Sequence, residues 1–200
     1  MNIEKVKNAK TKIIGKKIEY YKTIESTSVY AKQIAEDSKN NGKIIIAEMQ
    51  TNGIGTKGSS WYTGIDNIAM TIILNPNCKV LELEGLTLEM ASIIKESIQE
   101  LYNVELKIKK PNDLLLNNKK ISGILTQTTV IGQKVKYVLI GIGFNVNEIN
   151  FNKDTKDIAT SLKREYKDNN KNEIIFSRED IIIKIIEKLE KYLNQKEIEL

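Results

Sequence analysis

The clearest sign of a chemical role in this chain is a loop with three glycines within six residues, Gly53, Gly55 and Gly58. Glycine reaches positive φ at little steric cost, so a glycine-rich loop can turn several backbone N–H groups toward one anion. The loop follows the apolar run Lys43 to Met49, and its spacing also matches the dinucleotide-binding fingerprint. That fingerprint must open a helix, whereas here Trp61 and a new apolar run follow. The loop alone indicates either a phosphate-bearing ligand or a flexible hairpin connection.

A second group of polar residues surrounds a predicted β-hairpin. Val104 to Lys110 alternates apolar and charged residues, as a half-buried strand does. The chain then turns at Asn117 to Lys120, and a symmetric register places Asp113 opposite about Ile124, beside Gly123. A carboxylate and a cation therefore share one hairpin. The interior glycine either leaves room for a ligand or marks a plain bulge.

Four segments of the chain, taken in order, carry a family resemblance: Gly53 to Trp61, Lys110 to Asp113, Lys120 to Leu125 and Gly141 to Asn145. They resemble the motifs of the biotin protein ligase catalytic domain, Gly-Arg-Gly-Arg-x-Gly-x-x-Trp, Trp-Pro-Asn-Asp, Lys-x-x-Gly-Ile-Leu and Gly-x-Gly-x-Asn. Residues 25–28 and 48–50 resemble two further family segments, so the likeness covers residues 17 to 195.

The apolar patterns predict interleaved strands and helices in one domain, residues 1–200. Predicted strands are residues 18–24, 43–49, 67–74, 104–110 and 134–147, and predicted helices start at Ser26 or Thr27, at Leu81, at Ile158 and at Ser177. Pro111 ends its strand by removing a donor. The result is an α+β domain with a mixed, largely antiparallel sheet and helices packed on one face. The resemblance implies the same architecture, similar to class II aminoacyl-tRNA synthetases.

The resemblance implies an ATP-dependent biotin protein ligase, which makes biotinyl-adenylate from biotin and ATP and passes biotin to one lysine of a biotin carboxyl carrier protein. Two anions must meet in the first step and an oxyanion must be held in the second, so cations, N–H donors and Mg²⁺ are needed. Lys120 matches the family lysine that contacts the biotin carboxylate and the phosphate oxygens. Asp113, supported by Asn112, matches the residue that accepts a proton from or orients the incoming amine. Without the resemblance, these residues would be an ordinary turn lysine and plain turn chemistry.

The resemblance also implies two sets of binding residues. Biotin is expected to contact Ser26, Thr27, Ser28, Gln50, Gly53, Gly123 and Ile124. ATP or the adenylate is expected to contact Gly53, Gly55, Thr56, Lys57, Gly58, Trp61, Lys120 and Asn145. The ureido ring of biotin needs paired donors and acceptors, because leaving one unpaired costs roughly 1–3 kcal/mol. The hydroxyls of Ser26 and Thr27 suit helix capping equally well, and Trp61 suits packing better than reaction.

The chain departs from the family pattern at three places. Ile54 and Thr56 stand where the family has arginines that close over the adenylate, and Lys57 is a point charge that cannot form a bidentate clamp. Lys110 replaces the usual tryptophan. We also expect neither the winged-helix repressor domain nor the small C-terminal β-barrel domain of many relatives. A weak or inactive regulatory homologue that binds biotin or adenylate is therefore an alternative. A lipoate or octanoate transferase is a second, disfavoured because the glycine loop and Lys-x-x-Gly-Ile-Leu match the biotin branch.

Composition narrows the chemistry further. Of the 200 residues, 40% are hydrophobic and 28% charged, which is ordinary globular usage. The chain has no histidine and one cysteine, Cys78, which argues against a transition-metal site, a Cys-His nucleophile or an internal disulfide. The net charge is +5, but the lysines are scattered among 26 acids, so we expect no nucleic-acid partner. Without an N-terminal apolar stretch we expect a cytoplasmic protein without membrane contact. A homodimer is compatible with the sequence, which does not give the oligomeric state.

Overall fold

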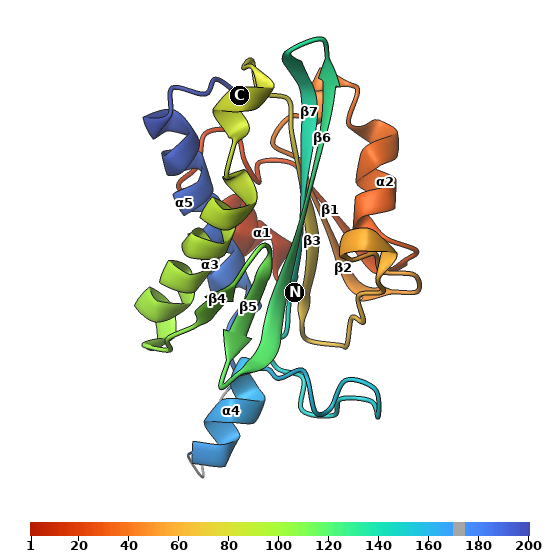
Figure 1. Cartoon of the computed structure of the whole chain (residues 1–200), viewed down its shortest axis with the longest axis vertical. Coiled ribbons are helices and arrows are strands. Elements are labelled where there is room, and N and C mark those ends of the chain that lie inside the picture. Colours follow the sequence, from red (N-terminus) through yellow and green to blue (C-terminus); the bar gives the residue numbers. More distant parts are fainter. Residues whose placement is uncertain (170–174) are drawn as a thin grey trace.

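One mixed β-sheet forms the centre of the molecule (Figure 1). The computed structural model describes residues 1–169 and 175–200, and within them seven strands lie in the order β1-β2-β3-β7-β6-β5-β4. The strands are β1 (Ile18–Ile24), β2 (Ile44–Gln50), β3 (Ile68–Leu74), β4 (Lys107–Lys109), β5 (Asp113–Leu116), β6 (Lys119–Ile131) and β7 (Lys134–Phe144). β1 and β2 are parallel, and the other neighbouring pairs are antiparallel. The predicted mixed, largely antiparallel sheet is confirmed.

Helices cover both faces of this sheet. They are α1 (Ile3–Lys7), α2 (Thr27–Ile34), α3 (Leu86–Tyr102), α4 (Leu162–Asn169) and α5 (Arg178–Gln195), with 3-10 turns η1 (Ser38–Asn40), η2 (Thr56–Gly58) and η3 (Val80–Leu83). Figure 1 shows α3 and α5 on one side of the sheet and α2 on the other. The prediction that the helices share one face therefore fails for α2. The reason is that β2 is apolar on both sides: Ile44 and Ile46 pack with α3 and α5, while Ile45 packs with α2.

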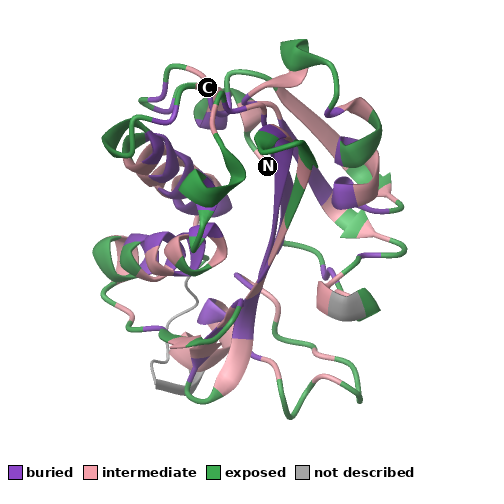
Figure 2. Cartoon of the chain, turned by 45° about the horizontal axis from the view of Figure 1, so that its top comes forward, coloured by how far each residue is buried: buried purple, intermediate pink, exposed green. Residues whose placement is uncertain are grey.

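The core lies mainly between the sheet and the α3–α5 layer. Every residue of β3 is buried, and in Figure 2 the central strands and the sheet-facing sides of the helices are the buried parts. Ile72, Ile94 and Ile185 belong to this cluster, each fully buried. Burying one such side chain stabilises the fold by about 1.5–3 kcal/mol. The core thus fixes the strands on which the site residues stand.

Most element boundaries follow the predicted signals. Ser26 caps α2, and Ser177 caps α5 by accepting a hydrogen bond from the N–H of Asp180 at 3.2 Å. The helix predicted from Leu81 is interrupted, because Gly85 adopts φ +81 between η3 and α3. The strand predicted over residues 104–110 shortens to β4, and the short helix predicted at residues 158–166 begins four residues later, at Leu162.

The β5–β6 hairpin turns at two residues only. Asn117 and Asn118 have φ of 50° and 63°, a left-handed conformation that asparagine tolerates and that a tight two-residue hairpin turn requires. Lys119 and Lys120 are consequently residues of β6, not of the turn as predicted.

The register of this hairpin also differs from the symmetric one. The two-residue turn and a register shift between Leu114 and Leu115 together place Asp113 opposite Gly123, one residue from the predicted Ile124. A bulge inserts one extra residue into one strand, which displaces every later pair by one position.

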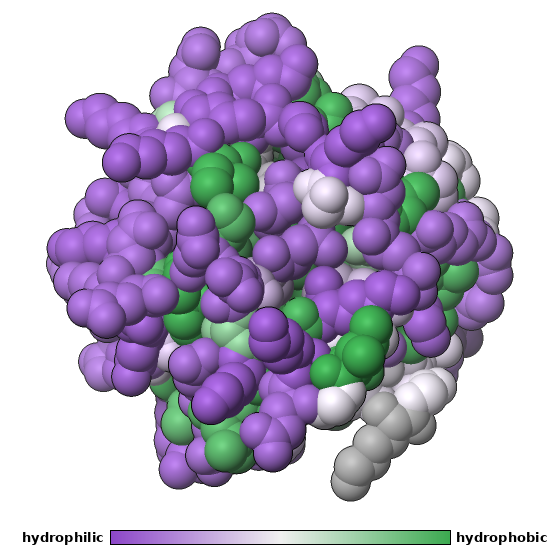
Figure 3. All heavy atoms as spheres, turned by 90° about the horizontal axis from the view of Figure 1, so that it is seen from above, coloured by the Kyte–Doolittle hydropathy of each residue, from purple (hydrophilic) through white to green (hydrophobic). Residues whose placement is uncertain are grey.

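The surface is mostly hydrophilic on the face shown in Figure 3, where apolar residues form separate patches. In the described part of the chain, no helix has both the length and the apolar composition needed to span a bilayer.

Candidate active site

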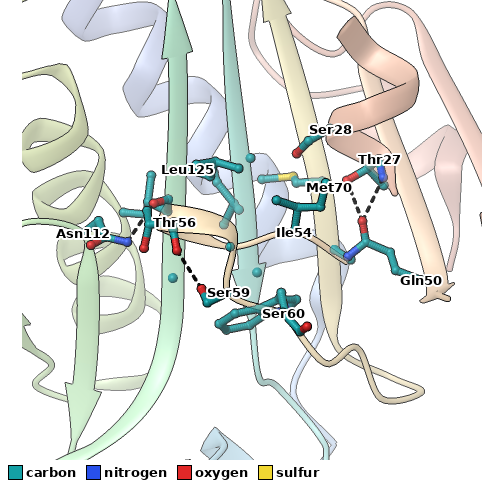
Figure 4. Close-up of a pocket in the computed structure, with 18 of the residues that line it drawn as sticks. Thr27, Ser28, Gln50, Ile54, Thr56, Ser59, Ser60, Met70, Asn112 and Leu125 are labelled. Atoms are coloured by element: carbon teal, nitrogen blue, oxygen red, sulfur yellow. Dashed lines mark hydrogen bonds between the residues drawn. The ribbon is translucent and has the colours of Figure 1, made fainter. Parts of the chain in front are cut away.

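Two adjoining hollows lie beside the glycine-rich loop. The first offers about 500 Å³ of space, part of it open to solvent, and is drawn in Figure 4. It is lined by Thr27, Ser28, Gln50, Ile54, Gly55, Thr56, Ser59, Ser60, Trp61, Ala69, Met70, Asn112, Lys120, Gly123, Ile124, Leu125, Gly141, Ile142 and Gly143. The second offers about 660 Å³ of space, also partly open to solvent, and is lined by Ser59, Ser60, Trp61, Tyr62, Lys120, Asn145, Phe151, Thr155, Ile158 and Ala159. The two hollows share Ser59, Ser60, Trp61 and Lys120, so these residues stand at their junction.

A chain of hydrogen bonds runs along the wall of the first hollow. Thr71 Oγ1 donates to Thr27 Oγ1 at 2.9 Å, and Ser28 Oγ lies 3.1 Å from Thr71 Oγ1. Thr27 Oγ1 and its backbone N–H both donate to Gln50 Oε1, at 3.0 and 2.8 Å (Figure 4). Gln50 Nε2 donates in turn to Thr63 Oγ1 at 3.1 Å. Each hydroxyl has one proton, so Ser28 must donate to Thr71 for the chain to close.

This direction of donation decides what the first hollow offers a ligand. The protons of Ser28 and Thr27 point to protein partners, which leaves lone pairs on both oxygens as acceptors. The amide of Gln50 has a second N–H beyond the one given to Thr63. The hollow therefore presents two acceptors and one donor, a pattern that complements two N–H groups beside one carbonyl.

Lys120 and Asp113 form an ion pair at the junction. Lys120 Nζ lies 2.7 Å from Asp113 Oδ1 and 5.5 Å from the centre of the Trp61 ring. The side chain of Asp113 is 21% exposed and that of Lys120 37%, so water and substrates can reach both. The acid and the lysine stand on the adjacent strands β5 and β6.

Trp61 packs directly on glycines of the sheet. A Cβ on Gly143 would lie 2.1 Å from the Trp61 ring, and one on Gly123 would lie 3.0 Å from it and 3.4 Å from Lys120 Nζ. The two glycines face each other across β6 and β7. They make room for the indole ring, which separates the two hollows.

The loop residues divide between roles. Gly55 and Thr56, expected at ATP, line the first hollow together with Ile54, and not the second. Gly53 and Gly58 line neither; a Cβ on Gly53 would lie 2.4 Å from the Trp61 carbonyl oxygen, so glycine lets the two ends of the loop approach. The side chain of Lys57 lies outside the described part of the chain.

The remaining expected residues have clear places. Asn112 and Ile124 line the first hollow and are joined, since Asn112 Nδ2 donates to the Ile124 carbonyl at 3.1 Å. Asn145 lines the second hollow and donates to the Thr160 carbonyl at 3.0 Å. Ser26 is buried and caps α2 without lining either hollow. Of the two readings open for Ser26, the structure shows capping.

The residues that sequence reasoning did not assign to the site include Thr71, Gly141 and Gly143; the two glycines were named only as part of a motif. Thr71 was a single polar residue in an apolar run, and only the fold brings it to α2. Gly141 and Gly143 alternate along β7 on one side of the sheet, and a Cβ on Gly141 would lie 2.9 Å from Ser28 Oγ. Glycines at period two within a strand were a usable signal of a closely approached face.

A buried ion pair supports the end of β2. Arg178 at the start of α5 donates to Glu48 at 2.5 and 3.0 Å, and Tyr20 donates to the same carboxylate at 2.5 Å. Burial opposes ionisation of Glu48, but the bonds from Arg178 and Tyr20 outweigh it and lower its pKa. Burial and the bond to Glu48 raise the pKa of Tyr20 to about 12. The pair ties β2 to α5 two residues before Gln50.

Among the described residues, no group of three or more His, Cys, Asp or Glu side chains could hold a metal ion. Among these described residues, the carboxylate that contacts Lys120 at the junction is that of Asp113, and the two form an ion pair.

Comparison with known proteins gives consistent matches. Residues 20–145 match the model of the biotin/lipoate A/B protein ligase family. The chain is 35% identical over 158 residues to the bifunctional ligase/repressor BirA of Bacillus subtilis (strain 168), covering 78% of this chain and 49% of that protein. It is 31% identical over 124 residues to the biotin--[acetyl-CoA-carboxylase] ligase of Paracoccus denitrificans, covering 61% and 51%. It is similar to the solved biotin protein ligase from Aquifex aeolicus in complex with biotin and ATP, with a TM-score of 0.71 and 25% identity over 90% of this chain and 73% of that chain.

Fold and site together define a catalytic domain of the class II aminoacyl-tRNA synthetase type that biotin protein ligases share. The match over residues 20–145 places the chain more narrowly: it belongs to the biotin/lipoate A/B protein ligase family. The chain spans about half the length of the curated relatives it matches. The resemblance found in the sequence is thereby confirmed, while the roles of individual residues stay predictions.

Proposed function

We propose that this chain is an ATP-dependent biotin protein ligase and that residues 1–200 form one catalytic domain. The observation that carries the proposal is the junction at Lys120, where a hollow with two acceptors and one donor meets a second, more apolar hollow. A cyclic urea such as the head of biotin supplies two N–H groups and one carbonyl, which satisfies Ser28, Thr27 and Gln50. An adenine nucleotide fits the second hollow, whose walls include the rings of Trp61, Tyr62 and Phe151.

In the first step, a carboxylate oxygen of biotin attacks the α-phosphorus of ATP and pyrophosphate leaves. Both reactants are anionic, so their approach is opposed by charge repulsion. The ammonium of Lys120 stands at the junction and offers three donors, which can bridge a carboxylate oxygen and a phosphate oxygen. Asp113, 2.7 Å away, holds that ammonium in place before the substrates arrive.

In the second step, a lysine amine of the carrier attacks the carbonyl carbon of biotinyl-adenylate and AMP leaves. The amine loses a proton as the amide forms, and the Asp113 carboxylate, 21% exposed, is an acceptor within reach of an incoming chain. Lys120 then stabilises the oxyanion and the departing phosphate.

Mg²⁺ is proposed to enter with ATP, bound by the phosphates rather than by a protein cage. The donor set at the junction supports this, because the carboxylate of Asp113 is already paired with Lys120. The ion supplies charge neutralisation of the triphosphate when bound.

Incubation with biotin, MgATP and a biotin carboxyl carrier domain, followed by mass spectrometry of the carrier, tests the proposal. We expect one biotinyl group on the carrier and none when its target lysine is replaced by arginine. Adenylate formation without transfer would instead support the regulatory homologue. Equal transfer of lipoate would support the second alternative, although the dithiolane ring of lipoate has no N–H groups for Thr27 and Ser28. Absence of both adenylate and transfer would refute the assignment.

We further propose that the ligase acts in the cytoplasm on a carboxylase carrier domain and does not require nucleic acid. The lysines and acids are scattered along the sequence, which supports the absence of a nucleic-acid partner. The oligomeric state, with a homodimer as one possibility, can be measured by sedimentation with and without ligands.

A further inference from the structure

Residues 151–160, here called the clamp segment, pair with the main chain of Lys120. The Lys120 N–H donates to the Ile158 carbonyl at 2.8 Å, and the Thr160 N–H donates to the Lys120 carbonyl at 2.9 Å. This forms a short parallel bridge centred on Ala159. The last residue of β7, Phe144, pairs with Ser122, so the clamp segment continues the sheet where β7 has ended. The backbone of the lysine is therefore fixed by a loop.

The same segment forms a wall of the second hollow. Phe151, Thr155, Ile158 and Ala159 line it, facing Trp61 and Lys120. One stretch of chain thus touches both the space proposed for the nucleotide and the backbone of the lysine that contacts its phosphate. A displacement of the segment must therefore change both the wall of the second hollow and the position of the Lys120 backbone.

Arg164, in the first turn of α4, holds the clamp segment in shape. Its Nη1 donates to the Lys156 carbonyl at 3.0 Å and to the Ala159 carbonyl at 3.3 Å. Its guanidinium carbon lies 5.4 Å from the centre of the Phe151 ring. Only a planar guanidinium can stack on a ring and direct N–H groups at two carbonyls at once.

A second contact acts on the same segment. Thr160, fully buried, donates its hydroxyl to Glu165, and Glu165 also accepts from Asn117 at 2.6 Å in the hairpin turn before Lys120. Two neighbouring residues of α4 therefore hold the clamp segment: Arg164 binds its carbonyl groups, and Glu165 binds the hydroxyl of Thr160.

We propose that Arg164 is a positioning residue for Lys120: it fixes the clamp segment, and the clamp segment fixes the lysine between the two hollows. The proposal rests on the ligase function proposed above. Arg164 does not line either hollow, so it acts through the segment and not by touching substrate. A residue that merely shaped the nucleotide wall would change the KM for ATP alone. A residue that merely stabilised the fold would change neither kinetic constant in the folded enzyme.

The kinetic test compares Arg164→Met with Lys163→Met in biotin-dependent pyrophosphate exchange. Lys163 is the adjacent cation on α4, and none of the ion pairs in the described residues involves it, so this control should behave as wild type. A small misplacement of a catalytic group costs up to roughly 100-fold, so we expect Arg164→Met to lower kcat by about 10-fold to 100-fold and to raise the KM for ATP. Arg164→Lys should recover only part of the loss. An unchanged kcat would overturn the proposal.

Backbone hydrogen exchange followed by NMR tests the positioning without any need for activity. In Arg164→Met the amides of Lys120 and Thr160 should exchange at least about tenfold faster, since their partners lie in the loosened segment. Amides of the β6–β7 ladder, such as that of Leu125, should not change. If Arg164→Met does not fold, Thr160→Val, which removes the other contact, should give the same pattern. Unchanged protection of the Lys120 and Thr160 amides in a folded variant would overturn the proposal. If the variant shows faster exchange but the wild-type protein has no ligase activity, the result would count against the ligase function alone.

Discussion

Thr71→Val tests the hydrogen-bond chain of the first hollow with almost no change in side-chain shape. Thr71 is fully buried, and its hydroxyl stands between Thr27 and Ser28 at 2.9 and 3.1 Å. Valine removes the donor to Thr27 and the acceptor of Ser28. The freed Ser28 proton then turns toward the hollow and presents a donor where the wild type presents an acceptor.

The size of the effect follows from these two lost bonds. Leaving a buried hydroxyl unpaired costs roughly 1–3 kcal/mol, and about 1.4 kcal/mol is a factor of ten in affinity. We therefore expect biotin to bind about 10-fold more weakly to Thr71→Val. The melting temperature should fall by about 2–4 °C for each kcal/mol lost, the value for a domain of this size. Thr71→Ser keeps the hydroxyl and should stay near wild type in affinity.

The chain contains one tryptophan, Trp61, and it lines the first hollow, so its fluorescence reports biotin binding directly. Thr126→Val is the matched control, because Thr126 Oγ1 is buried in β6 without a hydrogen-bond partner and its loss should cost nothing. Lipoic acid is the ligand for comparison. It has no ureido N–H groups, so its weak binding should change little, and the ratio of the affinities for biotin and lipoic acid should decrease in Thr71→Val. Equal biotin affinity in folded Thr71→Val and wild type would refute the donor and acceptor assignment.

Four further outcomes are expected. Lys120→Ala should nearly abolish biotin-dependent pyrophosphate exchange with little loss of melting temperature, because its side chain is 37% exposed; a wild-type rate would contradict the role. Asp113→Asn should slow transfer to the carrier more than adenylation, and single-turnover measurement of both half-reactions decides between them. Arginine at both Ile54 and Thr56, which line the first hollow, should lengthen the residence of biotinyl-adenylate about tenfold or more, as measured by filter retention. Glu48→Gln should lower stability at pH 7 by about 1–3 kcal/mol. Since folding lowers the pKa of Glu48, its contribution is complete above the ordinary glutamate value near 4.3 and disappears as the pH falls through the lower folded value, so the two melting temperatures should converge in acid.

The fold was predictable wherever local patterns and packing agree. The limits of β1, the caps at Ser26 and Ser177 and the stripe of α5 follow from alternation, capping hydroxyls and helical spacing. The side of the sheet taken by α2 was not, because β2 is apolar on both faces and periodicity cannot choose between them. The partner of Asp113 was predicted to within one residue, because neither the two-residue turn nor the register shift that set the pairing leaves a mark in the apolar pattern.

The candidate site was predictable where it resides in motifs and not where it resides in contacts between distant segments. Lys120, Asp113, Asn112 and Gln50 stand together as expected. Thr71 joins Thr27 across 44 positions of sequence, and no local signal distinguishes it from any threonine in a buried strand. The last residues of the clamp segment were predicted as the start of a helix, and their pairing with Lys120 instead depends on tertiary structure.

The walls of the two hollows are held in place in different ways. Substitutions in the two walls are therefore expected to change different kinetic constants. The polar wall of the first stands on α2, β2 and β3, whose backbones are paired in regular structure. One wall of the second is the clamp segment, held by the side chains of Arg164 and Thr160. Rigid elements keep recognition groups in place in every step, whereas a loop held by a few contacts can shift with its ligand. Changes in the hydrogen-bond chain should therefore act on the KM for biotin, and changes at Arg164 should act on kcat and the KM for ATP.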